Sequence, residues 1–423
     1  MIDINLIRED KAAVIKELSR RGGDFTCDID KIYALDKTWR ELLKRSESLK
    51  AEKNSVSAEI GKLKREKKSA EAQIASMQGI AVKIKELDSE IRDLKAEFDS
   101  ILMLIPNITD PAIPFENSVI REEGEVIPPA FEAKTHWEIG EDLGILDFAA
   151  AASLSGSRFP LLKGRGCELE RGLSRFMLDL HTSKHGYTEI MPPHLVKEEI
   201  MRGTGQLPKF REDMYALNDG SLFLIPTAEV PLANLVRERI TEPSDLPLKY
   251  TALTPCFRRE AGSYGKDTSG LIRNHQFNKV ELVNIVSSVE SEETHLKLLT
   301  ESEEVLRLLG LSYRVLLLGS SDTGFSASKT YDLEVWMPGE KLWREVSSCS
   351  NCLDFQARRM EARTRGENSS TVYLHTLNSS GLAVGRIFAA VLENFQREDG
   401  SVAIPEALRP YMNGLKELRK DAK

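Results

Sequence analysis

Two arginines, two acids and an aromatic residue flank one polar, glycine-containing segment in the middle of the chain. The segment is AGSYGKDTSG, residues 261–270, and the flanking residues are Arg258, Glu260, Arg273, Phe277 and Glu281. A strand, a loop and a return strand would bring these side chains together. Guanidinium groups bind phosphates through paired hydrogen bonds, and a Phe ring offers a stacking face for a base. We therefore predict a nucleotide site on this hairpin, although charged hairpins are often only solvated surfaces.

The cysteines and histidines offer a second possible chemistry. Cys349 and Cys352 form a C-x-x-C pair, which taken alone indicates a zinc site or a redox dithiol. No second C-x-x-C or suitable C-x-x-H pair lies nearby, and the other three cysteines, Cys27, Cys167 and Cys256, are isolated. His181 and His185 lie one helical turn apart, where we expect a solvated or packing role.

Composition excludes several classes of protein. The 423 residues include 58 Lys and Arg against 66 Asp and Glu, a net charge of -8, which excludes a globally basic nucleic-acid binder but not a local basic face. The length predicts two or three domains. No apolar run approaches the roughly 20 residues of a membrane span, and the charged N-terminus is not typical of a signal peptide. Five cysteines are too few for a disulfide framework, so we expect a cytoplasmic protein.

Two apolar runs recur at the heptad spacing of a coiled coil. The first has the seams Leu35, Leu42, Leu49, Val56, Leu63 and Trp39, Ser46, Lys53, Ile60; the second has Met77, Ile84, Ile91, Phe98, Ile105 and Ile80, Leu87, Leu94, Ile101. Seams spaced by three and four residues predict supercoiled helices. A polar stretch between the runs allows a reversal near residue 69. We predict an antiparallel helical hairpin, preceded by a short helix over about residues 8–20.

Positive charge is concentrated on the first helix of this hairpin. Residues 37–68 contain eleven Lys and Arg and five Glu, a net of +6, whereas residues 69–105 carry a net of -3. In an acidic chain such a helix is suited to a polyanion, whose phosphates and shape it would contact. A dimerisation or spacer element is the alternative interpretation.

The remainder of the chain is predicted to be a mixture of helices and strands. Five prolines between residues 106 and 129 indicate a linker with turns. Beyond it we predict a helix over 166–186 and strands over 222–225, 313–318, 331–337, 342–346 and 372–377. The sequence contains neither a GxxxxGK[ST] loop nor a strand-linked GxGxxG, so the two common nucleotide-binding scaffolds do not fit. An antiparallel sheet with helices to one side fits better.

Further motifs follow the basic hairpin in a fixed order. They are GTGQLPKF (203–210), PTAEVPL (226–232), FRRE (257–260), REVSSCSN (344–351), DFQARR (354–359), GLAVGR (381–386) and IPEALRPYMNG (404–414). With them, essentially the whole chain resembles the bacterial-type seryl-tRNA synthetases, which are class II aminoacyl-tRNA synthetases.

The resemblance implies an α+β fold with three parts. These are an N-terminal tRNA-binding domain over residues 1–105, with a coiled-coil arm over about 35–105; a linker over 106–130; and a class II catalytic domain over 131–423, an antiparallel sheet flanked by helices. The first class-defining motif would lie around 186–193, with a proline at a homodimer interface. The second would be the Arg258 hairpin, and the third the segment 381–386.

The resemblance also implies roles for individual residues. The positions matching L-serine contacts are Thr227, Ala228, Glu229, Arg258, Glu281, Asn378 and Ser380, with the amino group on the Thr-x-Glu loop and the hydroxyl on Glu281. The positions matching ATP contacts are Arg258, Arg259, Glu260, Arg273, Phe277, Glu345, Val346, Ser347, Ser348 and Arg386. Arg258 and Arg386 would be catalytic, Phe277 would stack on adenine, and Glu345 with Ser348 would hold Mg²⁺. Where the family more often has Asn-Gly-Ser, this chain has Ser379 in place of the glycine.

The activity implied is a serine–tRNA ligase that forms seryl-adenylate from L-serine and ATP and transfers serine to the 3′ end of tRNA(Ser), with tRNA(Sec) as a second substrate. It implies a homodimer with Mg²⁺, without structural zinc and without a membrane partner, in which Cys349 and Cys352 are packing residues. A non-catalytic paralogue and a ligase that charges a carrier protein are the alternatives. The intact site residues disfavour the first, and the arm disfavours the second.

Overall fold

The computed structural model describes residues 1–261, 269–366 and 370–420. The chain divides into two compact units. One comprises Ile2–Ser19 and Gly23–Pro106, and the other comprises Met1, Arg20–Gly22 and the residues from Asn107 onward. In the described part of the chain, no helix is both long and apolar enough to cross a membrane.

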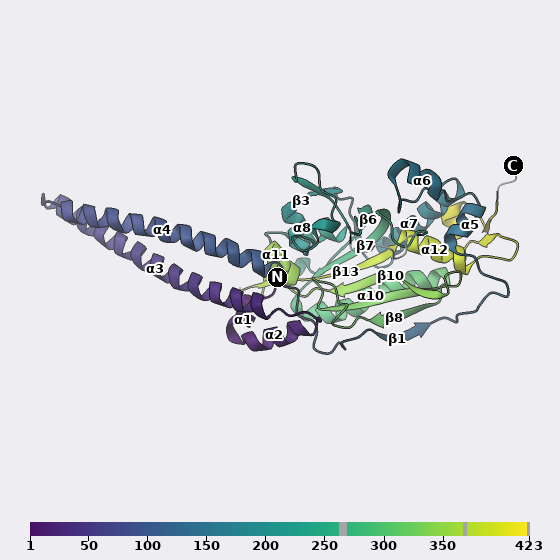
Figure 1. Ribbon diagram of the computed structural model, residues 1–423, viewed down its shortest axis with the longest axis horizontal. Coiled ribbons are helices and arrows are strands. Elements are labelled where there is room, and N and C mark those ends of the chain that lie inside the picture. The colour runs from purple at the N-terminus through teal and green to yellow at the C-terminus, as the bar shows by residue number, and fades with distance from the viewer. Residues whose placement is uncertain (262–268, 367–369, 421–423) are drawn as a thin grey trace. The chain divides into compact units, whose positions relative to one another are not determined.

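The smaller unit is helical and contains the predicted hairpin. Its helices are α1 (Ile4–Glu9), α2 (Lys11–Ser19), α3 (Thr26–Arg65) and α4 (Glu71–Leu102). The long helices α3 and α4 lie side by side (Figure 1), and the chain reverses between Arg65 and Glu71. The predicted hairpin and its reversal point are confirmed.

The apolar seams hold this hairpin together. Every position of the predicted seams is buried or half-buried, including the polar ones. Ser46 on α3 is nearly fully buried, and its hydroxyl donates to Asp88 Oδ1 on α4 at 2.9 Å. Lys50 Nζ reaches the same oxygen at 2.9 Å. The polar seam residue therefore keeps a hydrogen bond across the hairpin instead of opening the seam.

The short helix predicted over residues 8–20 is confirmed as α2, but it begins at Lys11, and the sequence did not predict the separate helix α1 before it. Asp10 separates α1 from α2, and its side chain accepts a hydrogen bond from Ala13 N at 2.9 Å. A carboxylate of this kind caps a helix N-terminus, so α2 begins anew after Asp10. Within the same unit, Arg8 on α1 donates to the buried Asp36 of α3 at 2.7 and 3.0 Å. This pair links α1 to the base of the hairpin.

The larger unit is built around an eight-stranded sheet in the order β1-β8-β9-β10-β13-β7-β6-β2. In that order the strands are Ser118–Glu123, Tyr313–Leu317, Lys329–Met337, Leu342–Asn351, His375–Ala383, Gln276–Val286, Leu248–Phe257 and Thr188–Glu189. All neighbours pair antiparallel except β2 and β6, which are parallel. The predicted antiparallel sheet is confirmed.

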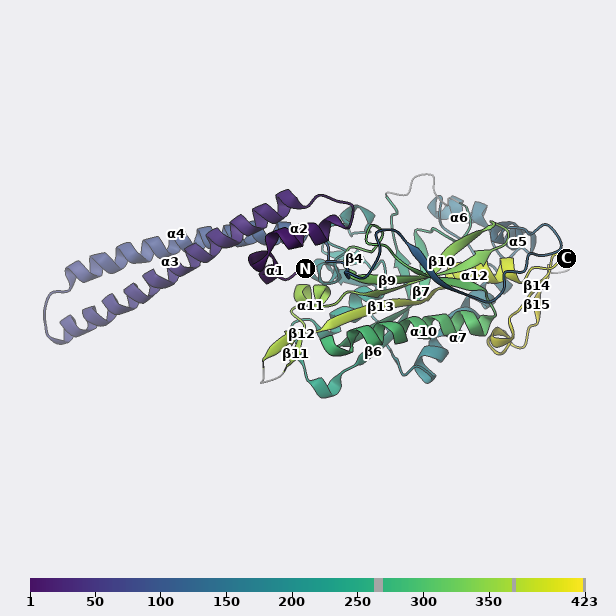
Figure 2. The same ribbon diagram turned by 90° about the horizontal axis from the view of Figure 1, so that it is seen from below.

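Three long helices cover one face of this sheet. They are α7 (Arg165–Ser183), α10 (Ser291–Leu309) and α12 (Val384–Asn394), and α10 runs along β13 (Figure 2). Their apolar side chains form one core with Val280 and Leu282 of β7. Because successive side chains of a strand point to opposite faces, Lys279 and Glu281 must face the other way. The functional face is fixed by this alternation.

Smaller elements complete the larger unit. The short helices are α5 (His136–Asp142), α6 (Phe148–Ser155), α8 (Glu198–Thr204), α9 (Glu229–Ala233) and α11 (Phe355–Met360). The short strands are β3 (Leu195–Lys197), β4 (Leu222–Leu224), β5 (Ile240–Thr241), β11 (Arg363–Arg365), β12 (Thr371–Tyr373), β14 (Val402–Ala403) and β15 (Glu417–Leu418). The 3₁₀ turns are Arg211–Asp213, Asn234–Val236, Pro243–Asp245, Ser288–Glu290 and Glu406–Met412. Of these, α9 and α11 pack with Val283 and Ile285 on the face of β7 opposite the long helices.

Three predictions about the larger unit need correction. The segment 106–130 is more than a linker, because β1 lies within it and pairs with β8. Its side chains are almost all exposed, so it lacks the apolar pattern that would have marked it as a strand. The strand predicted over 342–346 continues to Asn351 as β10, and the one predicted over 372–377 is two strands, β12 and β13. Both central strands extend through serine and asparagine residues that line a cavity.

Candidate active site

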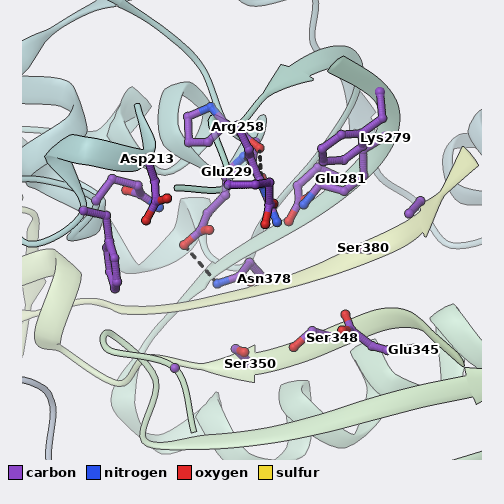
Figure 3. A pocket seen from close by; sticks show the side chains of 18 of the residues that line it. Asp213, Glu229, Arg258, Lys279, Glu281, Glu345, Ser348, Ser350, Asn378 and Ser380 are labelled. Carbon is purple, nitrogen blue, oxygen red and sulfur yellow. Dashed lines mark hydrogen bonds and ion pairs between the residues drawn. The ribbon is translucent and has the colours of Figure 1, made fainter. Parts of the chain in front are cut away.

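A cavity of about 750 Å³ lies on the sheet face opposite the three long helices. Its walls come from β7, β10, β13, the segment before α9, the loop after β6 and the first turn of α12 (Figure 3). Most of the predicted site residues line it: Thr227, Glu229, Arg258, Glu260, Arg273, Phe277, Glu281, Glu345, Val346, Ser348, Asn378, Ser380 and Arg386. The structure therefore brings together motifs that are separated by up to about 160 residues in the chain.

Strand β7 supplies the floor of the cavity. Phe277, Lys279 and Glu281 follow one another at every second position, so they share the cavity face. In the register of β13 with β7, Ser380 lies directly opposite Glu281. A small hydroxyl residue beside a buried acid leaves room for a small polar ligand.

Glu229, the first residue of α9, is one of two acids at this end of the cavity. Its Oε1 accepts hydrogen bonds from Gln356 Nε2 at 2.7 Å and from Asn378 Nδ2 at 3.1 Å. Withdrawal from bulk water, and then the nearby Glu281, raise the pKa of Glu229 to about 7. A cation that enters the cavity, such as an ammonium group, would stabilise the ionised form of this carboxyl group.

Glu281 is the second acid, and it has a partner that the sequence did not reveal. The residue is nearly fully buried, which raises the pKa of its carboxyl, and Lys279 opposes this shift by forming an ion pair with it. The two residues are on the same strand and face. Glu281 is therefore an acid with a cationic partner and not an isolated buried charge.

Three arginines, Arg258, Arg273 and Arg386, also line the cavity. Arg258 follows β6, donates through Nε to Pro226 O at 3.3 Å, and lies 5.3 Å from the centre of the Phe277 ring. Arg273 Nη1 donates to Glu260 at 2.7 Å. The predicted closeness of these hairpin residues is confirmed. Residues 262–268 of the predicted loop lie outside the described residues.

Arg386 enters the cavity from the first turn of α12. Its Nε donates to Ile272 O at 3.2 Å and its Nη1 donates to Glu345 O at 2.7 Å. Nη1 also lies 3.3 Å from the Glu345 carboxylate. The guanidinium is thus held between the strand β10 and the segment that returns to β7.

A β-bulge on β10 determines which residues of that strand reach the cavity. The register with β9 shifts between Glu345 and Ser347. In a regular strand, residues three positions apart point to opposite faces, but the extra residue of a bulge reverses the alternation. Glu345 and Ser348 therefore both line the cavity, as a shared metal or phosphate contact requires.

Next to this pair, Asp332 of β9 lies opposite Ser348 in the strand register. Burial, and then the neighbouring Glu345, raise the pKa of Asp332. Withdrawal from solvent opposes ionisation of Glu345 as well, but the neighbouring cations, Arg386 foremost with Arg258 and Lys279, together lower the pKa of Glu345. Asp332 Oδ1 is buried without a hydrogen-bond partner among the described residues. An ionised carboxylate, a hydroxyl and an unpartnered carboxyl oxygen fit a hard cation such as Mg²⁺.

Three predicted site residues do not line the cavity. Ala228 is fully buried, and Arg259 is exposed on the hairpin. Ser347 points to the opposite face of β10, where its hydroxyl donates to Ser380 O at 2.7 Å. Conversely, sequence reasoning missed Lys279, Asp332, Gln356 and Asp213. Two of these could have been found from the sequence. Gln356 lies in the DFQARR motif, and Lys279 lies two residues from both Phe277 and Glu281, so it faces the same side of β7.

The C-x-x-C pair is buried, and burial raises the pKa of both thiols. Cys349 Sγ contacts His295 O at 3.9 Å, and Cys352 Sγ is within 3.8 Å of Asn378 Nδ2. His181 is also buried, with its Nδ1 3.0 Å from that of His185. These side chains have packing surroundings.

The cavity therefore combines two acids with three arginines, an aromatic ring and a candidate cation site. Arg258 lies close to both acids (Figure 3). Arg273 and Arg386 line the part that we call the arginine end. The acid end suits a small ligand that carries an ammonium and a hydroxyl group. The arginine end suits a nucleoside polyphosphate. A carboxylate placed between them could attack a phosphorus atom.

Known proteins match this chain in sequence and in fold. Residues 1–109 match the family model of the Seryl-tRNA synthetase N-terminal domain, and residues 212–395 match the tRNA synthetase class II core domain (G, H, P, S and T). The serine–tRNA ligase of Geobacter sulfurreducens is 53% identical over 99% of this chain and 100% of its own length, and that of Exiguobacterium sibiricum is 50% identical over the same shares.

Solved structures agree with the sequence relatives. The crystal structure of seryl-tRNA synthetase from Pyrococcus horikoshii complexed with ATP has a TM-score of 0.93 and 39% identity, with 100% of both chains covered. The cytoplasmic serine–tRNA ligase of Naegleria fowleri in complex with AMP has a TM-score of 0.87 and 30% identity, covering 100% of this chain and 99% of its own. The chain therefore belongs to the seryl-tRNA synthetase family of class II aminoacyl-tRNA synthetases.

Proposed function

We propose that this chain attaches L-serine to tRNA in two steps at the cavity on the central sheet. In the first step the serine carboxylate attacks the α-phosphorus of ATP, which forms seryl-adenylate and releases pyrophosphate. In the second step serine passes to a hydroxyl at the 3′ end of tRNA and AMP leaves. The observation that carries the proposal is the placement of Glu229 and Glu281 in one cavity with Arg258, Arg273 and Arg386.

The acid end accounts for serine. The ammonium group lies against Glu229 and Thr227, the hydroxyl against Glu281 and Ser380, and Arg258 binds the carboxylate. Glu229 is already oriented by Gln356 and Asn378, so it needs little rearrangement to accept the ammonium. Alanine lacks the hydroxyl, but the ion pair with Lys279 means that Glu281 would not be left wholly unpaired. The rejection of alanine is therefore smaller than an isolated buried acid would give.

The arginine end accounts for ATP. Phe277 stacks on adenine, Arg258 neutralises the α-phosphate where the carboxylate attacks, and Arg273 and Arg386 hold the outer phosphates. Positioning and charge neutralisation supply the catalysis, and no protein nucleophile is needed. The side chains of Arg259 and Ser347 do not line the cavity. For these two residues we propose contacts with ATP only through their backbone atoms.

Serine-dependent ATP–pyrophosphate exchange, followed by charging of tRNA, tests the function. Exchange that is absent with purified protein would contradict it, and exchange without charging would favour a ligase for a carrier protein. The family resemblance supports tRNA(Ser) as the RNA substrate, a homodimer and a cytoplasmic location. For tRNA(Sec) the resemblance is the sole support, and parallel charging assays with both RNAs test it.

Replacing Glu281 should change amino-acid choice. For Glu281→Ala we expect the KM for serine in pyrophosphate exchange to rise roughly 10- to 150-fold, since a hydrogen bond to a charged group is worth about 1.5–3 kcal/mol. The preference for serine over alanine should narrow, and the KM for ATP should stay within about twofold. Glu334→Gln removes an acid of β9 that pairs with Arg314 outside the cavity, and it is the matched control. An unchanged serine KM in the Glu281 variant would contradict the assignment.

Serine binding should be coupled to proton release. The pKa of Glu229 is raised to about 7, so below pH 7 the carboxyl must lose a proton before it can pair with the ammonium group. We expect serine to bind more tightly as the pH rises from 6 to 8, with protons released below pH 7, measured by titration calorimetry in two buffers of different ionisation enthalpy. Glu281 contributes to the raised pKa, so Glu281→Gln should move this transition to lower pH. Affinity that is flat over this range would contradict the role of Glu229.

We propose that Mg²⁺ binds at Glu345 and Ser348, where it would neutralise phosphate charge, and that the chain holds no zinc. Among the described residues, Cys349 and Cys352 are not part of a cluster of three or more possible metal ligands, which a structural zinc site requires. Chelation by EDTA should abolish exchange, and Mg²⁺ alone should restore it. Cys349→Ser should retain activity. About one zinc per chain that resists dialysis, found by elemental analysis, would overturn this part.

The coiled-coil hairpin is proposed to bind tRNA through α3. A deletion of residues 47–87 with a short bridge keeps the base of the hairpin and joins it at the level of the Ser46–Asp88 hydrogen bond. We expect exchange to remain within about twofold, while tRNA charging at limiting RNA falls at least about tenfold and its salt dependence flattens, because phosphate contacts are lost.

A charge reversal provides a second test of the arm. The double variant Lys64→Glu with Lys68→Glu reverses two charges at the end of the basic segment 37–68. The double variant Lys83→Glu with Lys85→Glu makes the same charge change at exposed positions of α4 and serves as the control. We expect the first variant to weaken tRNA binding more than the second. If exchange and charging fall together in the deletion variant, the arm is a structural support of the catalytic unit, and its proposed role is wrong.

A further inference from the structure

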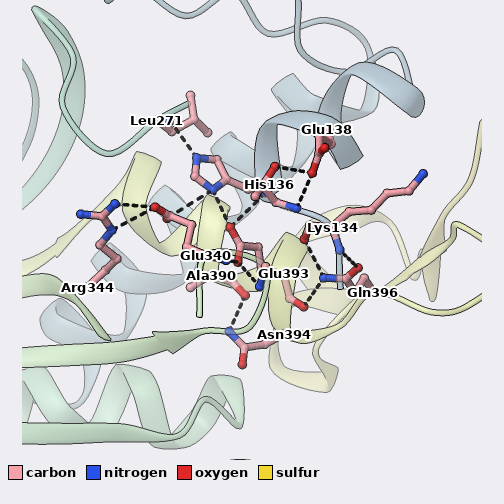
Figure 4. Close-up of polar contacts among 12 residues, drawn as sticks. Lys134, His136, Glu138, Leu271, Glu340, Arg344, Ala390, Glu393, Asn394 and Gln396 are labelled. Atoms are coloured by element: carbon pink, nitrogen blue, oxygen red, sulfur yellow. Dashed lines mark hydrogen bonds and ion pairs between the residues drawn. The ribbon is translucent and has the colours of Figure 1, made fainter. Parts of the chain in front are cut away.

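A buried histidine outside the cavity is bonded to the segment that carries Arg273. His136 is the first residue of α5 and is fully buried. Its Nδ1 lies 2.7 Å from Glu393 Oε1 on α12, and its Nε2 lies 3.0 Å from the backbone nitrogen of Leu271 (Figure 4). Leu271 lines the cavity, two residues before Arg273.

These two contacts fix the tautomer of the ring. The amide of Leu271 can only donate, so Nε2 must offer its lone pair and the proton of the neutral ring must be on Nδ1. That Nδ1–H donates to Glu393. The same carboxylate also accepts from the backbone nitrogens of His136 at 3.0 Å and Gly339 at 2.8 Å. Glu393 thereby connects α12, α5 and the turn between β9 and β10.

The tautomer also decides against a metal site at this place. His136, Glu340 and Glu393 have ligand atoms within 4.8 Å of one another, which is a metal-like spacing. A metal on Nδ1 would require the proton to move to Nε2, where it would meet the N–H of Leu271. Glu340 is instead paired with Arg344. The cluster is therefore suited to holding backbone segments together.

The residue before Leu271 confirms how closely this segment is seated. Gly270 has φ +74°, and a Cβ atom there would come within 2.2 Å of His136 Nε2 and 2.8 Å of the Trp137 ring. Only glycine fits both the conformation and the space. The chain that returns from the hairpin loop thus rests on the side chains of α5.

The contacts continue from Leu271 to the phosphate-binding groups. The carbonyl of the next residue, Ile272, accepts from Arg386 Nε at 3.2 Å. Arg386 in turn donates to the backbone of Glu345. Glu393 lies two helical turns beyond Arg386 on α12. The buried pair of His136 and Glu393 is therefore connected by hydrogen bonds or along α12 to the segment 271–273, to Arg386 on α12 and to β10, which line the arginine end of the cavity.

We propose that His136 is a positioning residue for ATP: its Nε2 holds the amide of Leu271 and so fixes the Ile272 carbonyl that orients Arg386. This inference rests on the proposed function, because it assumes that the arginine end of the cavity binds ATP. It assigns no contact between His136 and serine.

Two conservative substitutions separate the contacts of the ring. His136→Asn places an amide donor near the position of Nδ1 and leaves Leu271 without its acceptor, whereas His136→Gln places an amide oxygen near that of Nε2. For His136→Asn we expect the KM for ATP to rise about 3- to 10-fold, the effect of one neutral hydrogen bond, with the serine KM within about twofold. His136→Gln should restore ATP affinity. Glu138→Gln weakens the cap of α5 without touching Leu271 and serves as the control.

An equal rise in both KM values, or an equal effect of Glu138→Gln, would mean a general structural role and overturn the proposal. An ATP KM within twofold for His136→Asn would also overturn it. Should that variant fail to fold, hydrogen exchange on the full wild-type chain decides: ATP should slow exchange of the Leu271 amide, and no change would contradict the proposal. Failure of this proposal and failure of the proposed function can be told apart. If the proposed function is wrong, serine-dependent ATP–pyrophosphate exchange is absent from the wild-type protein. If only the role of His136 is wrong, that activity is present, and the ATP affinity of the variant, measured by calorimetry, equals that of the wild type.

Discussion

The alternation of side chains on the central strands is the constraint on which the site depends. Val280 and Leu282 must be buried under α7, α10 and α12, and this fixes the orientation of β7. Phe277, Lys279 and Glu281 then have to line the opposite face. A slip of one residue in the register would bury the charges in the apolar core. Burial of the apolar side chains on one face of the sheet therefore also determines which polar side chains meet in the cavity on the other face.

The charged groups that meet in the cavity compensate one another. Lys279 forms an ion pair with Glu281. Gln356 and Asn378 donate hydrogen bonds to Glu229. Arg386 favours the ionised form of Glu345. Removal of charges from water is costly unless partners are in place, and each of these acids has one within the cavity. Such preorganisation is what a reaction without a protein nucleophile requires.

Local signals in the sequence predicted much of this structure. The heptad seams gave the hairpin because its helices bury residues that are close in the chain, and ordered motifs identified most cavity residues. What could not be predicted depends on distant contacts. The bulge that puts Glu345 and Ser348 on one face is a property of the pairing of β10 with β9. The exposed strand β1 carries no apolar pattern, because only its backbone pairing with β8 defines it.

The same reason explains why His136 went unnoticed. It is a single histidine at the start of a short helix, and its partners, Leu271 and Glu393, are 135 and 257 residues away. Conversely, Arg259 was expected at the site because the resemblance placed it in the ATP-binding stretch with Arg258 and Glu260, yet its side chain is exposed just beyond the end of β6. Adjacency in a motif does not place a side chain in a cavity. The order of the strands and their pleat does.

A crystal structure of the chain with a non-hydrolysable seryl-adenylate analogue would test the central claim most directly. We expect the ammonium group to lie within about 3.2 Å of Glu229, the hydroxyl within the same distance of Glu281, and adenine against Phe277. An analogue that binds in this cavity with its ammonium on Glu281, or that binds elsewhere on the chain, would contradict it.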